Sequence, residues 1–201
     1  MRRLLASLSC LLLAACITVG KRGTDSAMVS YDFGPVAASL LGEARRQPLA
    51  VEVRAPMWFD TRGIDYRLLY AEPARLREYA RARWAGPPTQ LIEQRLAQQL
   101  ELSMAGRGQA SCLLQVEITE FSQLFSSPDS SRGVLQGRAL LLDHSRRQLA
   151  DLDLHLEQAA PGQDAAGGVA ALTATVTRLA VDLLAWEKRL IADGKAGDCS
   201  G

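Results

Sequence analysis

The chain contains 201 residues with a formal net charge of only +1, and 22% of its residues are charged while 48% are hydrophobic. This balance argues against a nucleic-acid-binding protein, and no run of like charges indicates an electrostatic contact with a membrane. The four cysteines and two histidines form neither a C-x-x-C pair nor a Cys/His cluster, which argues against a metal site or a thiol-redox site.

The N-terminus has the features of a bacterial lipoprotein signal. Two arginines precede an apolar run at residues 4–13, and the small residues Ala14 and Ala15 stand directly before Cys16. We therefore predict a signal peptide over residues 1–15 and a covalent lipid on Cys16. An ordinary secretory peptide is the alternative. A transmembrane helix is disfavoured because it would need about 20 mostly apolar residues.

The residues after Cys16 indicate where the protein is located. Asp at the next position usually retains a bacterial lipoprotein in the inner membrane, but residue 17 is Ile, so we expect the periplasmic face of the outer membrane. Residues 16–28 are aperiodic and predict a lipidated N-terminus with a flexible tether that spans on the order of 20 Å. The remainder, residues 29–201, is long enough for one domain with a well-buried core.

The first part of this domain predicts short strands followed by a helix. Candidate strands occur at residues 29–33, 49–54 and 64–70. Residues 74–83 are rich in Ala and Arg and have a helical composition. In the loop after the second strand, Trp58 and Phe59 are our prediction for an exposed contact with a partner.

The middle of the chain predicts a helix and then a meander. Thr89 is a plausible N-cap for a helix that extends to about residue 104, since apolar residues recur there at helical spacing. Three alternating segments follow as strands, with a loop at residues 126–131, and we expect them to be consecutive and antiparallel. They lie at residues 112–121, 134–142 and 149–156.

The last periodic segment is a long helix. From Val169 to Leu190 apolar residues step by threes and fours, which fits packing on the sheet or, alternatively, a coiled-coil partner. Together the segments predict a single α+β domain: a largely antiparallel sheet with two or more helices packed on one face.

Cys112 and Cys199 are the cysteines that remain in the globular part. An oxidising periplasm permits a disulfide between them, which would close a long loop. The alternative is a buried free thiol at Cys112, because that residue shares a strand face with Leu114 and Val116.

No catalytic arrangement is evident in the sequence. His144 is more simply a turn residue and His155 a residue on the wet face of a strand, where Asp151 and Asp153 are solvated neighbours. The chain has no G-x-S-x-G nucleophile motif, and Gly106-Arg107-Gly108 lacks the lysine and the spacing of a phosphate-binding loop. We predict a non-enzymatic protein without a cofactor or a metal.

A series of aromatic and proline residues carries a family resemblance. Aromatic residues are dense between Tyr66 and Trp84, where burial in the core is the simpler explanation for most of them. Together with the Cys16 signal, the ordered motif residues resemble those of the PqiC-type ABC transport auxiliary lipoproteins, most densely over residues 31–104. The motif positions are Tyr31, Phe33, Gly34, Pro35, Tyr66, Tyr70, Tyr79, Trp84, Pro87 and Pro88.

The resemblance implies an outer-membrane lipoprotein that assists a lipid-trafficking system. Its partners would be an MCE-domain protein and an ABC transporter, and a homo-oligomer would suit that setting. No catalytic residues carry over from the family, so the motif positions are expected to define the fold and to contribute to interfaces. Two other functions stay open: a structural or assembly lipoprotein of another envelope complex, and a periplasmic hydrolase.

Overall fold

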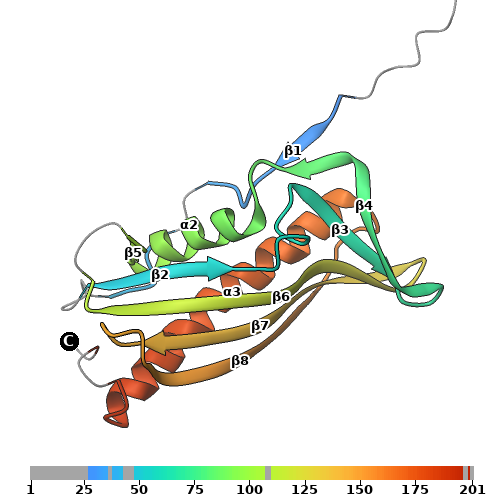
Figure 1. Cartoon of the computed structure of the whole chain (residues 1–201). Coiled ribbons are helices and arrows are strands. Elements are labelled where there is room, and N and C mark those ends of the chain that lie inside the picture. Colours follow the sequence, from blue (N-terminus) through green and yellow to red (C-terminus); the bar gives the residue numbers. More distant parts are fainter. Residues whose placement is uncertain (1–26, 36–37, 43–47, 107–109, 197–198, 200–201) are drawn as a thin grey trace, which may run out of the picture.

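A computed structural model describes residues 27–35, 38–42, 48–106, 110–196 and 199. Within these ranges the chain forms one α+β domain, with an eight-stranded sheet and two helices that cover one of its faces (Figure 1). The elements are β1 (Val29–Tyr31), β2 (Leu49–Arg54), β3 (Gly63–Leu68), β4 (Glu72–Trp84), α2 (Pro88–Leu100), β5 (Ser103–Met104), β6 (Cys112–Ser127), β7 (Ser130–Leu142), β8 (Gln148–Ala159) and α3 (Ala165–Ala192).

The sheet is mixed, so the prediction of a largely antiparallel sheet was only partly right. β6 is its central strand. One edge of β6 pairs with β7, while the other pairs in parallel with β2 along its first half and with β3 near its end. β1–β4 and β2–β5 are also parallel. Parallel partners are joined by long connections, which is why local sequence patterns did not reveal them.

The meander of β6, β7 and β8 confirms the predicted order of three antiparallel strands. The strands are longer than predicted, and the loop expected at residues 126–131 shrinks to a tight turn, because Ser127 already pairs with Ser130. On β8, Leu154 lies in the core while His155 is exposed. The predicted division of this strand into an apolar and a wet face is therefore correct.

The predicted helix at residues 74–83 is wrong, because that segment belongs to the strand β4. It pairs antiparallel with β3 through Tyr66↔Arg77 and Asp65↔Glu78, with two irregularities in the register. Residues with good helix propensity occupy it, but propensity is a weak preference that tertiary contacts override. The strand buries Ala82 and Trp84 in the core.

α2 starts and ends differently from the prediction. Pro87, rather than Thr89, stands at the N-cap. Thr89 lies in the first turn, where its backbone N–H and its hydroxyl both donate to the Asp60 carboxylate, at 3.1 and 2.6 Å. The helix ends at Leu100, since Glu101 adopts a left-handed conformation. A carboxylate from the β2–β3 loop thus satisfies donors at the helix N-terminus.

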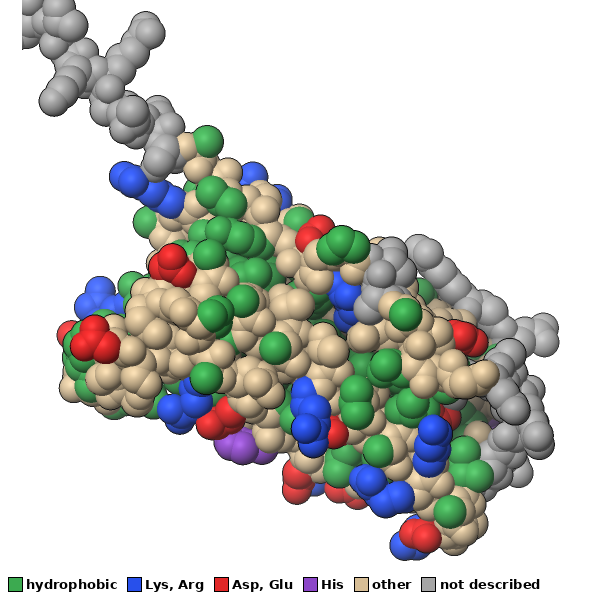
Figure 2. Space-filling model, turned by 180° about the vertical axis from the view of Figure 1, so that it is seen from behind, with side chains coloured by type: hydrophobic (Ala, Val, Ile, Leu, Met, Phe, Trp, Pro, Cys, Tyr) green, Lys and Arg blue, Asp and Glu red, His purple; other side chains and the backbone are tan. Residues whose placement is uncertain are grey.

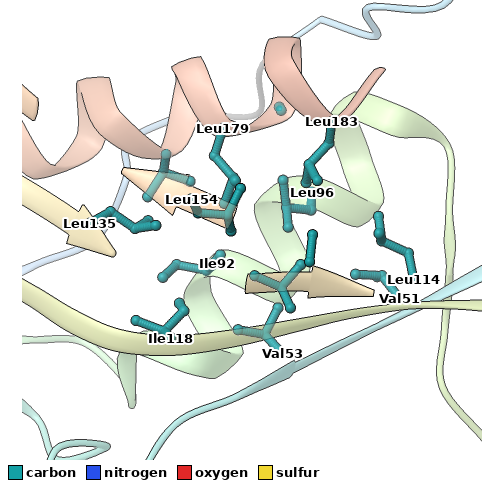
Figure 3. Close-up of a cluster of buried hydrophobic side chains, with 14 of the residues drawn as sticks. Val51, Val53, Ile92, Leu96, Leu114, Ile118, Leu135, Leu154, Leu179 and Leu183 are labelled. Carbon is teal, nitrogen blue, oxygen red and sulfur yellow. The ribbon is translucent and has the colours of Figure 1, made fainter. Parts of the chain in front are cut away.

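The two helices meet the sheet in one continuous core. Figure 3 shows Leu179 and Leu183 of α3 directed toward Ile92 and Leu96 of α2 above the buried strand residues, and all four side chains are at most 2% exposed. This packing supports the sheet alternative over the coiled coil for α3. By length and composition α3 could also cross a membrane, but half of its most apolar window is buried inside the domain.

A glycine lets α3 approach the sheet closely. A Cβ atom on Gly133 of β7 would lie 2.7 Å from the backbone nitrogen of Leu172, closer than real Cβ contacts occur. The N-terminus of α3 is capped by the Asp164 carboxylate, which accepts a 2.7 Å hydrogen bond from the Gly167 backbone. Sequence and packing thus fix the position of this helix on β7.

Cys112 and Cys199 are joined by a disulfide in the structure, with Cα atoms 5.7 Å apart. The bond connects the start of β6 with the residues that follow α3, and 87 positions separate the two cysteines. Of the two alternatives considered for Cys112, the structure contains the disulfide rather than the free thiol.

Candidate functional site

Two of the motif aromatics meet in the core beside the end of β4. The Phe33 and Trp84 rings lie 5.4 Å apart between centroids, and Phe121 of β6 is stacked on Trp84 at 5.8 Å. All three side chains are buried. Aromatic pairs of this kind add about 0.5–1.5 kcal/mol beyond the burial of their area. The contact attaches the segment after β1 to the central strand.

Arg95 of α2 holds the motif turn at residues 33–35. Its guanidinium donates to the backbone carbonyls of Phe33, Gly34 and Pro35, with distances of 3.1 Å to the last two. Gly34 has a φ of +75°, a conformation that favours glycine, and its N–H donates to the Asp32 carboxylate. Arg95 is buried, and so is its hydrogen bond to Phe33, while those to Gly34 and Pro35 are partly buried.

A cavity of about 350 Å³ lies between this turn and α2. Its lining combines apolar side chains and glycines with two glutamine amides, one carboxylate and one guanidinium. Such groups suit hydrogen bonding to a polar partner, but they include no nucleophile paired with a base. The lining residues are Asp32, Phe33, Gly34, Ala85, Gly86, Leu91, Gln94, Arg95 and Gln98.

A second aromatic group fixes β3 and β4 against the meander. The Tyr66 and Tyr79 rings lie 4.7 Å apart, and Tyr66 also contacts Phe125 at 5.9 Å. The Tyr79 hydroxyl donates to the Gln123 side chain at 2.7 Å, and Gln123 donates in turn to Ser131. Burial, followed by the nearby Tyr66 and Asp164, raises the pKa of Tyr79 above its usual value. The hydroxyl therefore remains a neutral donor.

The remaining motif residues have simpler surroundings. Tyr70 is 49% exposed and belongs to neither aromatic group. Tyr31 lies at the end of β1, where its carbonyl accepts from the Ala85 backbone at 2.6 Å. Pro87 and Pro88 start α2. The motif thus gathers mainly where β1, β4 and α2 meet.

A buried carboxyl lies within the motif segment of β3. Asp65 is 5% exposed, and its Oδ1 atom has no hydrogen-bond partner among the described residues. Burial, together with the nearby carboxylates of Glu78 and Glu120, raises the pKa of Asp65 to about 7, although Arg67 acts in the opposite direction. Arg67 is ion-paired with Glu120 at 3.3 Å. Among the described residues, no group of three or more His, Cys, Asp or Glu side chains could hold a metal ion.

The two residues predicted as a partner contact differ in exposure, although their rings touch edge to face at 5.7 Å. Trp58 is 63% exposed and its neighbour Met57 is 93% exposed, but Phe59 is only 2% exposed. Phe59 is therefore wrong as an exposed contact. The Phe59 N–H donates to the Pro56 carbonyl at 2.9 Å, and the tight turn that results directs its ring into the core while Trp58 stays outside.

The two histidines considered in the sequence analysis do not form a site with each other. His144 lies in the turn after β7, and His155 lies on β8 with a ring nitrogen 3.1 Å from Gln136. Cys16 falls outside the described residues. Arg95 and Asp60 are contacts that the sequence analysis missed. The sequence did contain a signal for Arg95, because this charged residue falls on the same helix face as the apolar Ile92 and Leu96.

Comparisons with known proteins place the chain in a family. Residues 34–183 match the family model of the ABC-type transport auxiliary lipoprotein component. No protein among the curated sequences matches the chain. The matched range contains α2, the meander, α3 as far as Leu183 and most of the motif positions.

Solved structures share this fold. A protein from Xanthomonas campestris, described with the family name DUF330, superposes with a TM-score of 0.63 at 19% identity, covering 80% of this chain and 89% of its own. A second crystal structure, of an uncharacterised protein, gives a TM-score of 0.60 at 18% identity and covers 78% and 96%. With the family match across three quarters of its length, the chain belongs to the ABC-type transport auxiliary lipoprotein components.

Proposed function

We propose that this protein is a non-enzymatic auxiliary component of an ABC transport system that contains an MCE-domain protein and moves lipids or other hydrophobic molecules. The observation that carries the proposal is the family match over residues 34–183, which follows the Leu-Ala-Ala-Cys signal that ends at Cys16. In this proposal the lipid on Cys16 anchors the domain to the outer membrane, and the domain acts in the periplasm by docking a partner.

The β2–β3 loop supports a docking role. Met57 and Trp58 project from a turn whose other residues are fixed, since Phe59 is buried and Asp60 binds the first turn of α2. Exposed tryptophans on rigid supports are frequent hot spots of protein interfaces. We therefore assign the contact with the MCE-domain protein, or with a second copy of this chain, to the loop around Trp58.

In-cell photocrosslinking tests this proposal. A photoreactive amino acid replaces Trp58 in the natively lipidated protein, and the matched control replaces Thr177, which is exposed on α3. Mass spectrometry of the outer-membrane fraction should identify an MCE-domain protein with the first variant and far less of it with the second. Crosslinks to an unrelated envelope complex would instead favour an assembly lipoprotein and overturn the proposal.

The anchor has a separate test. Replacement of Cys16 by Ser should remove the acyl mass and release the mature chain from the membrane fraction, because two acyl chains are what make anchoring stable. Deletion of the gene should also change envelope permeability or lipid balance. A deletion strain with an unchanged envelope, together with no copurifying transport component, would contradict the function.

A further inference from the structure

Three arginines from separate parts of the chain assemble at the end of the molecule where β1 joins β4. Arg81 and Arg83 lie on the last part of β4, and Arg62 lies in the loop before β3. Arg62 donates to the Trp84 carbonyl at 3.1 Å, and Arg83 donates to the Ser30 hydroxyl at 3.4 Å. Two of them, Arg62 and Arg83, border one hollow of about 510 Å³. We call this the β1–β4 patch.

The positive charge of the patch is not neutralised by the described residues. Arg62, Arg81 and Arg83 are exposed, and none of them has an ion pair in the part of the chain that the structure describes. Farther back on the same strand, in contrast, Arg75 and Arg77 are both paired with Glu72. Glu78 is the carboxylate that borders the hollow, so the patch keeps a net positive charge.

Apolar side chains accompany these arginines. Met28 and Val29 are 50% and 46% exposed, and Met28 borders the same hollow. Figure 2 shows hydrophobic and basic side chains together at the end of the molecule where the described chain begins. Basic and apolar groups side by side are what a surface needs to bind phosphate headgroups and to insert between them.

The position of the patch in the chain identifies its occupant. In the proposed function Cys16 carries the membrane anchor, and only twelve residues lead from it to Met28, which limits their separation to at most about 40 Å. This segment itself contains Lys21 and Arg22. The patch is therefore the described surface that the anchor keeps nearest to the bilayer.

We propose that the β1–β4 patch is a membrane-contact surface, in which Arg62, Arg81 and Arg83 bind the phosphate groups of anionic phospholipids while Met28 enters the headgroup layer. This inference rests on the anchoring part of the proposed function. It orients the domain so that the patch faces the bilayer. The sequence has no run of like charges at these positions, because the fold is what brings Arg62 next to Arg81 and Arg83.

Vesicle binding of a chain without its acyl group isolates this contribution. The mature chain, residues 16–201 with Cys16→Ser, keeps every described element and the disulfide. It is sedimented with vesicles of phosphatidylethanolamine and phosphatidylglycerol at 3:1, and with vesicles in which neutral phosphatidylcholine replaces phosphatidylglycerol. Binding should be stronger to the anionic vesicles and should fall as salt increases.

Two matched double variants locate the contact. Each arginine near an anionic surface strengthens binding about fivefold, so Arg81→Glu with Arg83→Glu should weaken the partition coefficient by at least about tenfold. The control, Arg138→Glu with Arg178→Glu, makes the same change in net charge at exposed positions away from the patch and should alter binding less than about twofold. Arg81→Lys with Arg83→Lys should retain most of the binding.

Specific outcomes overturn the inference. Equal binding to anionic and neutral vesicles, an equal loss in the control pair, or no loss in the Arg81 and Arg83 pair would each contradict it. Circular dichroism melting curves show whether a variant is folded, and the lysine pair keeps the test valid if the glutamate pair is unstable. If the protein bound anionic vesicles through the patch but gave no crosslinks to a transport component, the membrane contact would be supported and the proposed transport function would be contradicted.

Discussion

The β7–β8 and β3–β4 hairpins are antiparallel parts of one sheet, but they are built differently. β7 and β8 pair from Arg132↔Ala159 to Leu141↔Ala150 without an interruption, and the register shifts only at the final pair. β3 and β4 pair at few positions, and their register shifts twice over a shorter length. β7 buries residues along most of its length, whereas β4 buries only Ala82 and Trp84, which lie at its end.

The comparison shows what the family motif does for the fold. A bulged hairpin has fewer ladder hydrogen bonds, so it needs support from elsewhere in the molecule. Tyr79 is held by Gln123, and Trp84 is held by Phe33 and Phe121. Most motif aromatics thus stabilise the irregular region, while the meander depends on ordinary alternation. Four substitutions test this difference, in order of decreasing expected effect.

The first substitution is Trp84→Ala. The side chain is 1% exposed and contacts two other aromatic rings, so its loss should lower the free energy of unfolding by about 3–5 kcal/mol. Urea denaturation followed by circular dichroism measures it. Trp58→Ala, at an exposed position, should change the value by less than about 0.5 kcal/mol. If both variants lost a similar free energy of unfolding, the buried motif would not stabilise the fold more than the exposed loop does.

The second change, Cys112→Ser with Cys199→Ser, acts on the meander side. The disulfide closes a loop across 87 positions, and its removal should cost about 2–5 kcal/mol, chiefly through the greater freedom of the unfolded chain. Urea unfolding of the variant should match that of the wild type in dithiothreitol. An unchanged midpoint under both conditions would show that the bond adds nothing to the stability of the meander.

The third substitution, Arg95→Met, removes the donors to the carbonyls of residues 33–35. The buried carbonyl of Phe33 and the partly buried carbonyls of Gly34 and Pro35 would lose a charged partner, which should cost about 2–3 kcal/mol. Arg178→Met is the matched control, because it breaks an exposed ion pair with Asp182 that contributes about 0.3–0.5 kcal/mol. Equal urea midpoints for the two variants would mean that the motif turn does not depend on Arg95.

The fourth substitution, Asp65→Asn, gives the smallest effect and depends on pH. The pKa of Asp65 is raised to about 7, compared with about 3.9 in an unfolded chain. The folded state therefore binds the proton more tightly, and the wild type loses stability as pH rises from about 4 to about 7. The variant should therefore be more stable than wild type at pH 8 and nearly equal to it at pH 4. If the difference in stability between the variant and wild type stayed constant from pH 4 to pH 8, Asp65 would not titrate in this range.

The regular parts of the molecule were predictable. Alternation at residues 112–121 and 149–156, with a strand candidate between them, identified the meander, and the threes-and-fours spacing from Val169 identified α3, because each pattern buries one face of a local element. The segment at residues 74–83 was misassigned, since its bulges break the period of two that marks a strand. Phe59 was also misjudged, because nothing local reveals which of two adjacent aromatics a turn directs inward.

The sequence by itself determined the lipoprotein signal, the order of the main elements and the residues of the family motif, because these depend on short-range patterns and on residue identity. The tertiary structure decided the parallel pairing of β2 and β3 with β6, the hydrogen bonds from Arg95 to the motif turn and the assembly of the β1–β4 patch. Each of these joins residues that are distant in the chain, and their contacts depend on the packing of the whole domain rather than on any local preference.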